Sequence, residues 1–113
     1  MSFLVNWLIS TLAIIITAYL LPGVVIESLF AAFVLALVLG LINAFLKPII
    51  IILTLPINIL TLGLLTLVIN ALLVMLADYI VPGFSVGSFW WAFLFSIILS
   101  IINLVLSQLK NKY

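Results

Sequence analysis

The chain consists of four long apolar stretches, separated by short breaks that contain proline, glycine or polar residues. The stretches cover approximately residues 3–21, 28–46, 60–81 and 88–109. Each is close to the roughly 20 residues that an α-helix needs to cross the ~30 Å hydrocarbon core of a bilayer. The pattern therefore predicts an all-α integral membrane protein with four transmembrane helices.

Two of the breaks predict turns. Pro22-Gly23 follows the first stretch, and Pro82-Gly83 follows the third. Proline next to glycine is typical of turns, because proline fixes one backbone angle and glycine permits conformations that other residues avoid. The first two helices should therefore form one hairpin, and the last two should form a second hairpin.

The sequence also predicts where the second helix begins and ends. Ser28 is expected to be its N-cap, since a serine hydroxyl can accept a hydrogen bond from a free amide in the first helical turn. Lys47-Pro48 is expected to close the helix, because proline disfavours helical geometry in the residue before it.

The segment between the hairpins, "PIIIILTLPINILTLG", is a proline-broken apolar connector. Pro48 and Pro56 leave pieces that are too short to cross a bilayer alone. The segment could extend the second helix, enter the membrane as a re-entrant element, or lie near the interface. Any non-helical part must pack against protein, where Thr54, Asn58 and Thr61 are available as hydrogen-bonding partners.

The two hairpins repeat one sequence pattern. The stretch "YLLPGVVIESLFAAFVLALVLGLINAF" returns as "YIVPGFSVGSFWWAFLFSIILSIINLV". Residues that are uncommon in apolar segments match in register, which chance agreement does not explain. The matching pairs are Tyr19 and Tyr79, Pro22 and Pro82, Gly23 and Gly83, Ser28 and Ser88, and Asn43 and Asn103.

This repeat predicts a single transmembrane domain over residues 1–113. It would contain a first hairpin at about 3–46, a connector at about 47–59, a second hairpin at about 60–109 and a polar tail at 110–113. An even number of spans separates equivalent positions. The halves should then have the same orientation and be related by an axis along the membrane normal.

Small residues follow one face of the second and fourth helices. They recur every four residues, which places them in one stripe along an α-helix. The stripe consists of Ala32, Ala36, Gly40 and Ala44 in the second helix, and of Ala92, Ser96 and Ser100 in the fourth. Such stripes allow close helix packing in lipid, where association depends on van der Waals fit and hydrogen bonds.

Three asparagines lie within the apolar stretches. Asn43 and Asn103 lie near the small-residue stripes, and Asn70 lies in the middle of the third stretch. An unpaired amide in hydrocarbon costs several kcal/mol, so each should find a partner. The asparagines could hold helices together, or they could line a wet path or a small-molecule site.

The lysines predict the orientation. Lys47, Lys110 and Lys112 fall on one side of a four-span arrangement, and that side should be cytoplasmic, with both termini. Lys47 is then expected to anchor a helix end at the interface. Glu27 and Asp78 would lie outside, where such residues are either solvated or form the mouth of a cation pathway.

The composition excludes several classes of protein. The chain is 70% hydrophobic and 4% charged, too few charges to cover a soluble domain. It contains no cysteine and no histidine, so thiolate and imidazole chemistry is unavailable. We therefore expect no enzyme activity, no cofactor and no metal, and the sparse positive charge predicts no nucleic-acid partner.

The chain resembles the bacterial family of small four-span membrane proteins named phage holin superfamily IV. The motifs that carry the resemblance are "YLLPG", "GLINAFLKP", "TLPINILTLGL", "LVINALL" and "YIVPGF", and they extend from about Trp7 to Asn103. The resemblance implies a multi-pass protein of the bacterial cytoplasmic membrane. By the family name, it also implies a holin-like oligomer that forms holes.

Three functions fit these features. The first is a structural or accessory membrane protein that self-associates, or joins a larger membrane complex, through its small-residue faces. The second is a holin-like oligomeric pore former or channel. The third is a small dimeric transporter, which an internal repeat and a proline-broken membrane segment would support.

Overall fold

The computed structural model of the chain describes residues 2–112 and the side chains of residues 3–110. Its elements are α1 (Ser2–Leu20), β1 (Val24–Ile26), α2 (Leu29–Leu41), the π-helical turn η1 (Ile42–Leu46), α3 (Lys47–Leu53), α4 (Leu55–Leu60), α5 (Leu64–Ile80), β2 (Phe84–Val86) and α6 (Phe89–Lys112). The four long apolar stretches are thus helical, as the sequence predicts.

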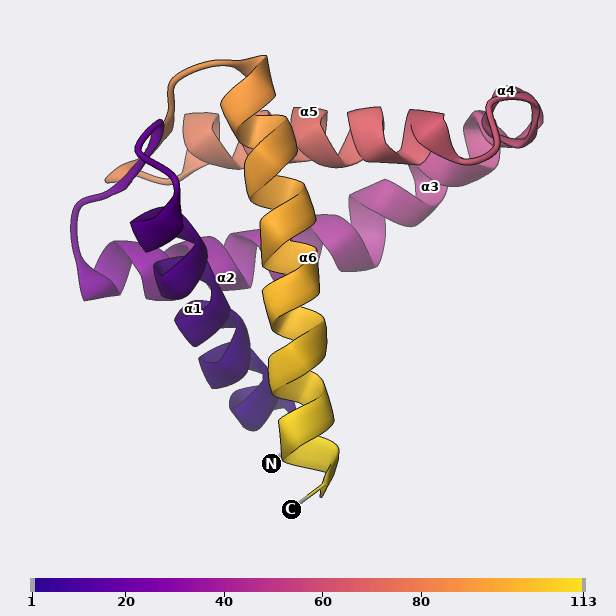
Figure 1. Ribbon diagram of the computed structural model, residues 1–113. Helices are drawn as coiled ribbons and strands as arrows, with labels where there is room; N and C mark the ends of the chain where they lie inside the picture. The colour runs from indigo at the N-terminus through magenta and orange to yellow at the C-terminus, as the bar shows by residue number, and fades with distance from the viewer. Residues whose placement is uncertain (1, 113) are drawn as a thin grey trace.

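The helices form two crossing pairs. Helices α1 and α6 pack together, and the ends of the chain lie near each other at one end of this pair (Figure 1). Helices α2 and α5 run across them, with α3 and α4 extending beyond the crossing. The core lies between the pairs and contains small residues that permit close approach, among them Ala13, Ala32 and Ala92, each fully buried.

A short antiparallel ladder joins the two hairpins. Strand β1 pairs with β2 so that Val24 lies opposite Val86 and Ile26 lies opposite Phe84. Hydrogen bonds extend the ladder at both ends, from Glu27 N to the Gly83 carbonyl (2.8 Å) and from Gly87 N to the Gly23 carbonyl (2.9 Å). From the sequence pattern, these segments are predicted only as turns.

Glycine is required beside this ladder for two different reasons. A Cβ atom on Gly23 would overlap the indole ring of Trp91, so only glycine allows the chain to pass the ring at this distance. Gly83 has a φ of 87°, which falls in the left-handed region that side chains disfavour. The two Pro-Gly breaks therefore position the strands as well as reversing the chain.

The second helix begins as predicted but does not end at Lys47-Pro48. The Ser28 hydroxyl accepts a hydrogen bond from Ala31 N at 3.1 Å, which confirms its role as the N-cap. The helical run then continues through η1 and α3 to Leu53. The expected boundary is wrong because η1 widens the helix just before the proline. A π turn bonds each amide to the fifth residue back, as Lys47 N does to the Ile42 carbonyl.

The connector extends the second helix and then adds a short helix, α4. The Thr54 hydroxyl donates to the Ile50 carbonyl at 2.9 Å, and the Thr61 hydroxyl donates to the Ile57 carbonyl at 3.1 Å. The Asn58 amide donates to Thr66 Oγ1 at 2.7 Å, which ties α4 to α5. The three polar side chains that the sequence offers to this segment therefore do form hydrogen bonds, two within the connector and one to α5.

Candidate functional site: a polar cavity beside Lys47

A small polar cavity of about 70 Å³ lies where the second, third and fourth apolar helices meet. Its polar wall comes from four different elements and includes the lysine nearest the middle of the chain. The polar lining residues are Asn43 of η1, Lys47 of α3, Asn70 of α5, and Ser96 and Ser100 of α6. Its apolar wall is formed by Leu39, Leu73, Val74 and Leu99.

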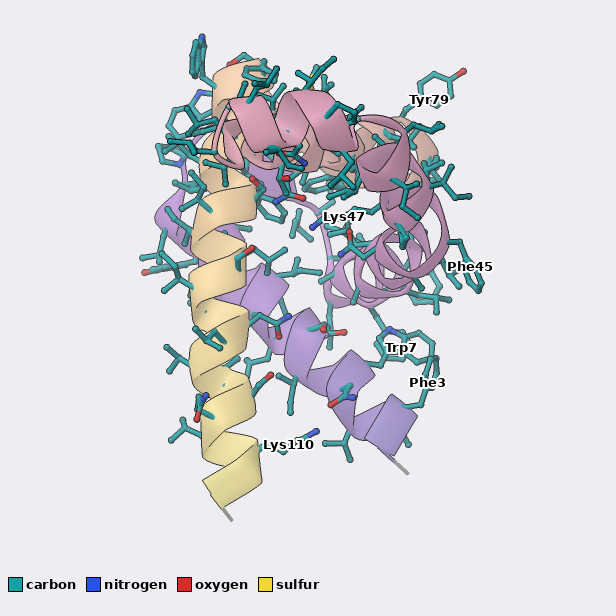
Figure 2. The ribbon with its side chains drawn as sticks, turned by 90° about the vertical axis from the view of Figure 1, so that its right-hand side faces the viewer. Phe3, Trp7, Phe45, Lys47, Tyr79 and Lys110 are labelled. Carbon is teal, nitrogen blue, oxygen red and sulfur yellow. The ribbon has the colours of Figure 1, made fainter. Side chains whose placement is uncertain are left out.

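Local helix geometry explains why these side chains meet. Asn43 and Lys47 are four residues apart, as are Ser96 and Ser100, so each pair shares one side of its helix. Helix α5 packs against α6 and also contacts α2 and α3, which brings Asn70 to the same place. Lys47 lies among the helices, whereas Phe45 and Tyr79 project outward (Figure 2).

The serine hydroxyl protons are already used. Ser96 Oγ donates to the Phe93 carbonyl at 2.9 Å, and Ser100 Oγ donates to the Ser96 carbonyl at 2.8 Å. Among residues 3–110, no hydrogen bond joins the side chains of Asn43, Lys47 or Asn70 to the protein. The free donors of this cavity are therefore the lysine ammonium and the two asparagine amides.

Neither acidic residue of the chain lies at this cavity. Asp78 Oδ2 accepts a hydrogen bond from Val86 N at 3.3 Å, beside the strand ladder. The Glu27 side chain lies next to Gly83, at the same end of the molecule. Neither residue lines the cavity, and the described side chains contain no ion pair.

Lys47 lies in a different environment from the one that its sequence position predicts. We expected it at a helix end, where its side chain would reach the interface. In the structure it is half-buried and lies within a continuous helical run from Leu29 to Leu53. Its spacing of four residues from Asn43 is the signal that could have placed both in one site.

The small-residue stripes divide into two groups. Ala32, Ala36, Ala92 and Ser96 are buried in the core of the molecule, with exposed fractions of 0%, 6%, 0% and 7%. Gly40 and Ser100 are exposed instead. Most of the predicted stripe therefore packs helices within one chain, and only its last positions reach the surface.

The other candidate residues lie outside the cavity. Asn103 is half-buried on α6 and does not line it, so the expected pair of Asn43 and Asn103 is not brought together. The prolines are exposed at the turns and in the connector, and Asn58 is buried there. The residues of the turns and connector are Pro22, Gly23, Pro82, Gly83, Pro48, Pro56 and Asn58.

An open groove of about 360 Å³ lies between α1 and the second helix. Gly40 and Ala44 line it, and aromatic side chains of Phe3, Trp7 and Phe45 flank it. Trp7 stacks on Phe33 with 4.1 Å between ring centroids, and its Nε1 donates to the Phe33 carbonyl at 2.9 Å. This tryptophan is therefore held in position beside the groove.

These features define a multi-pass helical membrane protein. Three helical runs of the described chain, Phe3–Leu20, Leu29–Leu53 and Phe89–Lys110, are long and apolar enough to cross a membrane. The apolar helix Leu64–Ile80 is slightly shorter.

The chain belongs to the family described as mycobacterial 4 TMS phage holin, superfamily IV, which matches residues 1–105. The resemblance seen in the motifs is thereby confirmed. An uncharacterized protein of Streptomyces coelicolor is 37% identical over 116 residues, covering 94% of this chain and 93% of that protein. The uncharacterized membrane protein YvlD of Bacillus subtilis is 36% identical over 111 residues, covering 93% of this chain and 92% of that protein. No solved structure matches the chain.

Proposed function

We propose that this chain is a structural or accessory protein of the bacterial cytoplasmic membrane that self-associates through the groove between α1 and the second helix. The observation that carries the proposal is that Gly40 is exposed at this groove and has open space beside its backbone. A Cβ atom added there would meet nothing within 4 Å, so the helix backbone is open to a neighbour. Small residues with accessible backbone are typical of helix contacts in lipid.

The rest of the small-residue stripe supports the choice of this groove. Ala32 and Ala92 are fully buried inside one chain, so a second copy cannot contact them without separating the helices. Gly40 and Ala44 are the exposed small residues of the same stripe. The aromatic rings beside them offer large contact areas to a helix that enters the groove.

Replacing Gly40 by leucine is expected to weaken self-association without unfolding the chain, because the new side chain fills the groove rather than the core. The measurement is energy transfer between two fluorophore-labelled populations in liposomes at several protein-to-lipid ratios. Wild type should exceed the value for random mixing, and the Gly40→Leu variant should approach it. Val105→Leu, which adds bulk at an exposed position of α6, is the matched control. Equal transfer in all three proteins would exclude this interface.

A holin-like oligomeric pore is the second candidate, and the polar cavity supports it. Polar side chains at depth in a membrane are costly and commonly mark pathways. The cavity of about 70 Å³ holds only about two waters. Any pathway would therefore need several copies, or a rearrangement of the helices around Asn43 and Asn70.

Liposome efflux distinguishes the two candidates. For a pore, release of a small dye should rise steeply with protein density, and replacing Asn43 together with Asn103 by leucine should change the rate. For an accessory protein, vesicles should stay tight at every density while energy transfer between copies persists. Steep efflux that the double variant leaves unchanged would remove these asparagines from the pathway.

The orientation proposed for the chain has both termini in the cytoplasm. Lys110 Nζ donates to Asn6 Oδ1 at 2.6 Å, which joins the two terminal helices on one side of the molecule. The side chain of Lys112 lies outside the described residues. Because Lys47 lies inside the helical bundle, the lysines near the C-terminus carry this argument.

The arrangement of the hairpins supports an internal repeat. Val24 pairs with the residue equivalent to Ile26, and Ile26 pairs with the residue equivalent to Val24. The two flanking bonds, Glu27 to Gly83 and Gly87 to Gly23, also exchange equivalent positions. An approximate two-fold axis through the ladder would produce this pattern.

A further inference from the structure

We propose that the cavity beside Lys47 binds one anionic group. The first step is the missing counter-charge. Lys47 is half-buried among apolar helices, and the two acidic residues of the chain, Glu27 and Asp78, lie beside the strand ladder instead. A lysine charge withdrawn from water is costly unless an opposite charge pairs with it. Neither acidic side chain of the chain supplies that opposite charge, so an anion from outside the chain would lower this cost.

The second step is the chemistry of the cavity wall. The ammonium of Lys47 supplies three N–H donors, and the amides of Asn43 and Asn70 supply two each. The hydroxyl protons of Ser96 and Ser100 are committed to backbone carbonyls. Carboxylates are absent from the described lining, so no negative charge of the chain competes for these donors.

The third step is size and access. A cavity of about 70 Å³ accommodates one small group but not a large organic anion. Asn43 and Ser100 are exposed, which leaves the cavity open on that side. Leu39, Leu73, Val74 and Leu99 form the rest of its wall, and this apolar surface strengthens the interaction between an anion and the ammonium.

Two sources can supply such a group, a free halide or the phosphodiester of a membrane phospholipid. Both present a single negative charge that can accept several N–H bonds at once. The shared prediction is an anion bound at Lys47, and the source is decided by experiment.

The test uses the full chain in a phosphate-free, uncharged detergent. In the first arm, thermal unfolding is followed while chloride replaces gluconate at constant ionic strength. In the second arm, phosphatidylglycerol is added and compared with diacylglycerol, which has the same acyl chains without the phosphate. Native mass spectrometry of the second samples counts the phosphatidylglycerol molecules that stay bound to each chain.

A rise in the unfolding temperature of wild type with chloride would identify a free anion, and a rise with phosphatidylglycerol but not diacylglycerol would identify a lipid phosphate. The Lys47→Met variant should lose this rise, and its apparent affinity should fall by about tenfold or more. Lys110→Met removes a lysine that donates to Asn6 outside the cavity, and should retain the rise.

Two further variants keep the test decisive if Lys47→Met does not fold. Asn70→Ala removes one amide donor while the charge stays, and should lower the anion affinity without abolishing binding. Lys47→Arg keeps the charge and should retain anion dependence. The proposal is overturned if neither anion stabilises wild type, or if Lys47→Met and Asn70→Ala respond to the anions as wild type does.

Discussion

Replacing Gly23 by alanine is expected to lower the free energy of unfolding by about 1–3 kcal/mol, the usual cost of overpacking a filled site. The new methyl group would overlap the indole of Trp91, which is half-buried at the start of α6. To relieve the overlap, either the ring must move or β1 must shift away from β2. Both movements disturb the ladder that joins the hairpins.

Thermal unfolding in detergent, followed by circular dichroism, measures this change. Gly40→Ala is the control, because it adds the same methyl group where nothing lies within 4 Å. That variant should match wild type or exceed it, since alanine is favoured over glycine inside a helix by roughly 0.5–1 kcal/mol. In a chain that already carries Trp91→Ala, the overlap cannot occur, so Gly23→Ala should lower the free energy of unfolding by less than it does in wild type. Equal destabilisation by the two glycine substitutions would contradict the steric explanation.

Replacing Phe95 by alanine is expected to lower the free energy of unfolding by about 2–5 kcal/mol, as for other large-to-small substitutions in a packed core. Phe95 is fully buried, and its ring lies 5.4 Å from that of Phe84 in β2, measured between centroids. In a membrane, separated helices are surrounded by lipid rather than water, so little of this destabilisation comes from the hydrophobic effect. It arises mainly because the removed ring leaves an empty volume and its neighbours lose their dispersion contacts.

The neighbouring residue provides the control for this second substitution. Leu94 is 43% exposed on the outer side of α6, so Leu94→Ala should change the unfolding midpoint much less. Both variants are compared in the same detergent by the same thermal scan. If they were equally stable, Phe95 would not belong to the core that joins α6 to the strand ladder.

Local signals account for the parts of the fold that the sequence predicts correctly. The apolar stretches are long enough to require helices in lipid, and Ser28 caps α2 with a bond to an amide only three residues away. Both features depend on neighbouring residues alone. The termination expected at Lys47-Pro48 depends on the same type of signal, but the π turn over Ile42–Leu46 alters the backbone before the proline is reached.

The remaining features depend on partners far apart in the chain. The strands β1 and β2 are three residues each, too short for a recognisable pattern, and each forms only because the other lies beside it. The polar cavity likewise requires α5 and α6 to be positioned against η1. The sequence marks Asn43, Asn70, Ser96 and Ser100 as polar residues within the membrane. It could not assign them to one site with Lys47, because helix order does not determine which faces meet.

The exchange of equivalent partners in the strand ladder has a consequence for how such a protein could have originated. Two identical hairpins, unconnected, could close the same ladder as a homodimer. Such a dimer would carry two copies of Lys47, one from each hairpin. In the joined chain the position equivalent to Lys47 is Ser107, so fusion of the halves allows a nearly symmetric scaffold to keep a single positive charge.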